Sequence, residues 1–103
     1  MTHAEARQWL DRQAERINEI VGDCAIQRSR GVYREDGDNE VLFYGTRTCN
    51  FRDVKVEDIA SGSEGARHEL FVAKLLEGLE GQRRLLNTVE AAILALKPEE
   101  TPV

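Results

Sequence analysis

The sequence predicts an α+β fold in which a β-hairpin lies between two helices. Three observations point to it: an amphipathic segment at 2–21, β-branched and aromatic residues at 24–56, and a long apolar repeat after residue 64. A length of 103 residues suits one domain, which we place at 1–97. Residues 98–103 form a polar C-terminal tail.

The first helix is expected at 2–21. Thr2 and Glu5 have the spacing of a capping box, in which each side chain satisfies the other residue's backbone N–H. Gly22 suits a left-handed C-cap. One face of this helix is apolar and consists of Ala6, Leu10, Ile17 and Ile20. Gln13 occupies the position on this face between Leu10 and Ile17.

The middle of the chain predicts a hairpin with strands near 26–34 and 40–47. Residues 35–39 contain Gly37 and Asn39, which tolerate the positive φ of tight turns. A third short strand is expected near 50–56, and residues 58–60 are expected to form a single helical turn.

The second helix is expected to follow the loop at 60–65. Ser61 and Glu64 have the spacing of a second capping box, and Pro98 stops the helix after Lys97. Gly78 and Gly81 are its weak points. The alternative is a break there into two shorter helices.

A heptad repeat runs along the second helix: Val72, Leu75, Leu79, Gln82, Leu86, Val89, Ile93 and Leu96. We expect this helix to pack antiparallel on the first one, with Leu10 opposite Leu86 and Ile17 opposite Leu79. In that register Gln13 faces Gln82, and a buried amide pair would fix the alignment. The alternative is that both glutamines reach solvent.

Further apolar residues widen these stripes beyond what a two-helix contact needs: Trp9, Phe71, Leu76, Leu85 and Leu94. We expect them to mediate self-association into a homodimer that forms a four-helix bundle. Gly78 and Gly81 would allow another backbone to approach closely. The alternative is a monomer whose hairpin folds back over the helices.

Basic charge is concentrated on the hairpin. The net charge of the chain is −5, yet residues 24–56 hold six basic and five acidic side chains. Tyr and Arg often carry interface energy, so the expected partner-binding residues are Arg28, Arg30, Tyr33, Arg34 and Tyr44. A protein partner is favoured, because an acidic chain repels nucleic acid at long range. Two alternatives are a nucleic-acid-binding dimer that uses the arginine strand, and arginines that pair with carboxylates of the same fold.

No cofactor, metal site or catalytic motif is expected. The acidic turn of Glu35, Asp36, Asp38 and Glu40 lacks calcium-loop spacing, and two cysteines and two histidines show no zinc pattern. The enzymatic alternative is a site at a dimer interface containing Cys49, His68 and Glu69.

These features favour a small non-enzymatic, oligomeric module for protein binding or assembly. The element order resembles that of the head–tail connector proteins of tailed bacteriophages, which also place a hairpin between two helices. The resemblance implies a phage or mobile-element origin and a structural or inhibitory role. The chain lacks a signal peptide pattern and an apolar run long enough to span a membrane, so a cytoplasmic location is expected.

Overall fold

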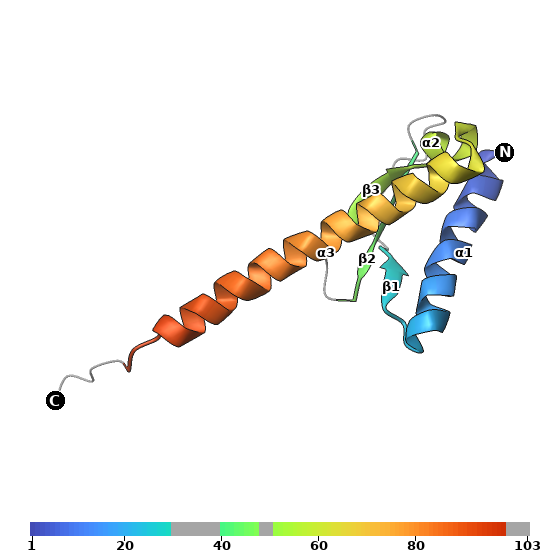
Figure 1. Cartoon of the computed structure of the whole chain (residues 1–103). Coiled ribbons are helices and arrows are strands. Elements are labelled where there is room, and N and C mark those ends of the chain that lie inside the picture. Colours follow the sequence, from blue (N-terminus) through green and yellow to red (C-terminus); the bar gives the residue numbers. More distant parts are fainter. Residues whose placement is uncertain (30–39, 48–50, 99–103) are drawn as a thin grey trace.

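The computed structural model describes residues 1–29, 40–47 and 51–98. It confirms the α+β class: an N-terminal helix, a three-stranded antiparallel sheet and a long C-terminal helix (Figure 1). The helix α1 and the sheet lie together at one end of the molecule, and the long helix extends away from them (Figure 1).

Helix α1 spans His3–Val21 and has the predicted caps. The Thr2 hydroxyl accepts a hydrogen bond from the backbone N–H of Glu5, the Glu5 carboxylate accepts one from the N–H of Thr2, and Gly22 has a φ of 78°. The buried face consists of Ala6, Leu10 and Ala14. Ile20, expected on this face, is exposed instead.

The sheet has the order β1-β2-β3. Strands β1 (Ile26–Arg28) and β2 (Val41–Thr46) pair antiparallel with Ile26 opposite Thr46, and β3 (Arg52–Lys55) pairs with the other edge of β2. The predicted third strand is confirmed. The expected turn at 35–39 and residues 30–34 of the first predicted strand lie outside the described residues.

Helix α2 (Val56–Ser61) replaces the predicted single turn at 58–60, and α3 begins at Glu64. The expected capping box at Ser61 is wrong. The Ser61 hydroxyl donates to the carbonyl oxygen of Glu57 within α2, and Ser63 caps α3 by accepting a hydrogen bond from Ala66 N–H. Because α2 takes Ser61 into its last turn, the next serine is left to start α3.

Helix α3 spans Glu64–Ala95 without interruption, so it passes through Gly78 and Gly81 and ends two residues earlier than expected. Both glycines lie close to other parts of this chain. Gly78 is buried, and a Cβ on Gly81 would lie 3.2 Å from Nη2 of Arg52 on β3. At Gly81 the neighbouring group is therefore a side chain of this chain's own sheet.

The expected antiparallel register between α1 and α3 is not found. Trp9 contacts Arg67 and Phe71 of α3, and further along α1, Ile17 lines a shared depression with Val72 and Leu75. The contacts thus advance in the same direction along both helices, which then diverge (Figure 1). Gln13 does not meet Gln82: it accepts a hydrogen bond from Arg16, and Gln82 accepts one from Thr46.

The buried core lies where the sheet meets α1, α2 and the first half of α3. Its largest fully buried side chains are Tyr44, Leu10, Leu42, Ile59, Val54 and Val56. The radius of gyration is 18.3 Å, whereas a compact chain of this length has about 13 Å. The difference reflects the extension of α3 away from this core.

Candidate functional site

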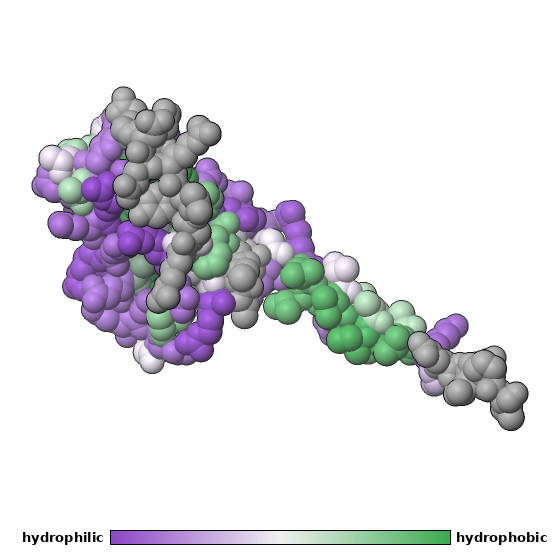
Figure 2. Space-filling view, turned by 180° about the vertical axis from the view of Figure 1, so that it is seen from behind, coloured by the Kyte–Doolittle hydropathy of each residue, from purple (hydrophilic) through white to green (hydrophobic). Residues whose placement is uncertain are grey.

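The second half of α3 is the part of the described structure that is most exposed. We call residues 83–96 the distal segment; every one of them is exposed. Figure 2 shows a hydrophobic surface along this projecting rod, beyond the mainly hydrophilic head. Its large apolar side chains are Leu85, Leu86, Val89, Ile93, Leu94 and Leu96.

The distal segment is helical because its residues favour that state. Leucine, arginine, glutamate and alanine are strong helix formers, and Arg84 pairs with Glu80 one turn earlier at 2.5 Å. An isolated helix of this length is nevertheless marginal in water, because most helical stability in proteins comes from burying an apolar face. This segment therefore has a helical form and an apolar face, and lacks a covering layer among the described residues.

The heptad seam continues from the distal segment back into the head. Ile17 and Ile26 meet that seam in a shallow depression of about 180 Å³, whose α3 side is formed by Val72, Leu75, Leu76 and Leu79. Ile17 and Val72 also border a second depression of about 170 Å³. The exposed stripe and the depressions therefore lie along the same seam of α3, with Gln82 between Leu79 and Leu86.

The residues predicted for self-association divide into two groups. Leu76, Leu85 and Leu94 are exposed, as a contact surface requires. Phe71 is buried, and Trp9 packs on it edge to face with ring centroids 6.2 Å apart. Arg67 covers the Trp9 ring at 5.9 Å. These two aromatic side chains therefore stabilise the head itself.

The predicted partner-binding residues of the hairpin are only partly described. Arg30, Tyr33 and Arg34 lie outside the described residues. Arg28 is exposed and pairs with Asp11 at 3.4 Å. Tyr44 is buried, with its ring 5.4 Å from that of Phe71, so its aromatic face is not exposed to a partner.

Other basic side chains of the sheet region also have partners in the same chain. Arg47 lies 3.0 Å from Asp23, and Arg52 lies 3.5 Å from Glu77. These pairs match the expectation that the arginines neutralise carboxylates of their own fold. The nucleic-acid-binding alternative gains no support from them.

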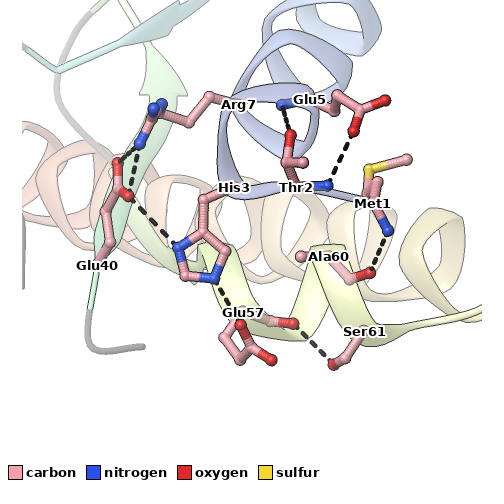
Figure 3. A network of polar contacts seen from close by, with 9 residues as sticks. All are labelled: Met1, Thr2, His3, Glu5, Arg7, Glu40, Glu57, Ala60 and Ser61. Carbon is pink, nitrogen blue, oxygen red and sulfur yellow. Dashed lines mark hydrogen bonds and ion pairs between the residues drawn. The ribbon is translucent and has the colours of Figure 1, made fainter. Parts of the chain in front are cut away.

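A polar network at the start of α1 was missed by the sequence reasoning (Figure 3). Glu40, assigned from the sequence to an acidic turn, is only 4% exposed and accepts two hydrogen bonds of 2.7 Å from Nη1 of Arg7. His3 lies between carboxylates, with Nε2 2.5 Å from Glu57 and Nδ1 3.9 Å from Glu40. The network joins α1, α2 and the start of β2. The spacing of His3 and Arg7, one helical turn apart, is the only sequence signal of it.

The structure describes two of the three groups considered for an enzymatic site. His68 and Glu69 are exposed on α3, and Cys49 lies outside the described residues. Cys24 is a free, exposed thiol. In the described ranges, no three His, Cys, Asp or Glu side chains gather in a way that would hold a metal ion. None of the helices described is long and apolar enough to cross a membrane.

Comparison with known proteins gives no relative: no family model, no curated protein and no solved structure matches the chain.

Proposed function

We propose that this chain is a small, non-catalytic assembly module that joins copies of itself through the distal segment of α3. The observation that carries the proposal is the row of exposed apolar side chains on a helix that projects from a folded head. Burying a leucine or isoleucine side chain contributes about 1.5–3 kcal/mol. Contact between two such rows therefore supplies the energy that the projecting helix lacks in isolation.

The head supports this role by fixing where the helix points. Core contacts hold the first half of α3 against the sheet, and the helix then continues without a break. A rigid base with an apolar arm is an arrangement suited to oligomer formation. A structural or inhibitory role in a phage or mobile element remains a prediction from the element order.

The solution mass tests the proposal. Light scattering after size exclusion, at low and moderate salt, should give a dimer or larger species against the 11.6 kDa chain. The double variant Leu86→Gln/Ile93→Gln should shift the mass to that of the monomer, because glutamine keeps the helix and removes the apolar face.

Val21→Gln provides a matched control. Val21 is 58% exposed and Ile93 is 64% exposed, and both are β-branched, but Val21 lies at the end of α1. The control should keep the wild-type mass. A wild-type chain that stays monomeric at every concentration would contradict the proposal.

A further inference from the structure

We propose that two copies pair antiparallel through their distal segments, so that Arg83 of each copy faces Glu90 of the other. This inference rests on the proposed function and deepens it, because it names the partner, the direction and the register. It follows from how charge is distributed beside the heptad seam.

The two flanks of the seam differ in chemistry. Within α3, one flank carries the charged side chains Arg83 and Glu90, seven residues apart, whereas the other carries Leu85 and Ala92. Side chains at such flanking positions form the ion pairs that set the orientation of paired helices. The charged flank is therefore the part of the surface that can discriminate between arrangements.

Parallel pairing would place unlike flanks together. Glu90 would then face the partner's Leu85, so it would meet no opposite charge. Antiparallel pairing reverses one helix and brings the two charged flanks to the same side. Only that direction lets the charges of one copy interact with those of the other.

The signs of the charges select one antiparallel register. With Leu86 opposite the partner's Val89, Arg83 faces the partner's Glu90 and the same pair recurs across the two-fold axis. A shift by one heptad toward the helix end would put Glu90 against Glu90. A shift toward the head would put Arg83 against Arg83. Each alternative places like charges together.

The state of these side chains in the single chain supports the assignment. Arg83 and Glu90 are exposed and have no ion pair with any other described residue, in contrast to Arg7, Arg28 and Arg52 of the head. The proposed register also places the partner's Leu96 opposite Leu79. Leu79 borders the 180 Å³ depression, so the end of one helix covers part of the other head's apolar surface.

Charge reversal tests the register. Arg83→Glu and Glu90→Arg each convert two attractive pairs into two repulsive ones, so each should weaken the dimer on the order of tenfold. The double variant Arg83→Glu/Glu90→Arg should restore wild-type affinity. An equimolar mixture of the two single variants should form a heterodimer preferentially, because each mixed pair is again complementary.

Arg84→Glu is the matched control, since it makes the same charge change on an exposed residue whose partner, Glu80, lies in its own helix. It should leave the dimer unchanged. If the protein dimerises but Arg83→Glu weakens it no more than Arg84→Glu does, the inference is overturned and the proposed function stands. A monomeric wild type would overturn both.

Spin labels give an independent readout of direction. In a Cys24→Ser/Cys49→Ser background, a label at Ala95→Cys should lie more than about 20 Å from its counterpart in the antiparallel dimer, because fifteen residues of helix separate the two sites. In a parallel dimer the labels would lie about 10 Å apart, the usual distance between helix axes. The short distance would overturn the inference.

Discussion

The hydroxyl of Tyr44 donates a hydrogen bond of 2.6 Å to Oδ1 of Asp11. Tyr44 is 1% exposed, so its phenol end needs a partner, and Asp11 provides it from the neighbouring helix α1. Burial, the hydrogen bond to Asp11 and the charge of that carboxylate raise the pKa of Tyr44 above its ordinary value of 10.0. The contact joins β2 to α1 at the centre of the head.

Replacing Tyr44→Phe should lower the free energy of unfolding by about 1 kcal/mol at neutral pH, because Asp11 loses a hydrogen bond. The raised pKa means that neutral Tyr44 stabilises the fold below pH 10, and that this stability falls as pH rises above 10, where the unfolded tyrosine ionises. The wild type should lose up to about 1.4 kcal/mol per pH unit there.

Urea titrations at pH 7 and pH 11 measure this effect. Groups other than Tyr44 titrate in both proteins, so the difference between wild type and Tyr44→Phe isolates the one side chain. The advantage of the wild type should shrink or reverse at the higher pH. An unchanged difference would contradict the role given to the buried phenol.

The Arg7–Glu40 pair should show a strong asymmetry between its partners. Arg7→Ala leaves a buried carboxylate without its main partner and should cost about 3 kcal/mol. Glu40→Gln keeps a hydrogen-bond acceptor for Arg7, and the charge of Arg7 reaches solvent. This change should therefore lower the free energy of unfolding by only about 1 kcal/mol. Arg12→Ala, at an exposed ion pair with Glu19, serves as control and should change stability little. Chemical denaturation ranks the three; Arg7→Ala matching Arg12→Ala would refute the asymmetry.

Two glycine-to-alanine changes should have opposite signs. Gly81→Ala gains helix propensity, and the guanidinium of Arg52, 3.2 Å from the new Cβ, ends a flexible side chain that can move. It should raise stability by about 0.5 kcal/mol. Gly22→Ala meets no atom within 4 Å but must adopt a φ of 78°, which costs about 1 kcal/mol. Thermal unfolding of both variants measures the contrast, and equal shifts would contradict it.

A chain that ends after Arg83 should keep a folded head. The removed helical residues, 84–95, are all exposed, and the last described hydrogen bond from α3 to the sheet involves Gln82. Its unfolding midpoint in dilute solution, followed by circular dichroism, should stay within a few degrees of the wild-type value. Self-association should be lost at the same time. A head that unfolds on truncation would show that the distal segment stabilises it within one chain.

Local sequence signals predicted the helices and strands, whereas the arrangement of these elements depends on tertiary packing that local signals do not define. The Thr2 cap, the Gly22 end and the strand at 52–55 each depend on a few neighbouring residues, so the sequence predicts them well. The predicted antiparallel packing of α3 on α1 was wrong, because a heptad pattern defines an apolar face of a helix but does not define what covers that face.

The site shows the same division. Leu76, Leu85 and Leu94 are exposed, as the predicted self-association requires, whereas the aromatic residues Phe71 and Tyr44 are in the core. Composition alone does not separate these outcomes, because an aromatic residue is as common in a core as at an interface. Glu40 shows the opposite case, since burial of a carboxylate depends on an arginine 33 residues away.

The unbroken passage of α3 through Gly78 and Gly81 has a consequence for spacing. In the proposed dimer the two heads lie at opposite ends of the paired helices, so the length of the distal segment sets the distance between the heads. Inserting a whole heptad into the distal segment would move the heads apart by about 10 Å and preserve their mutual orientation. Inserting three or four residues would instead rotate one head relative to the other.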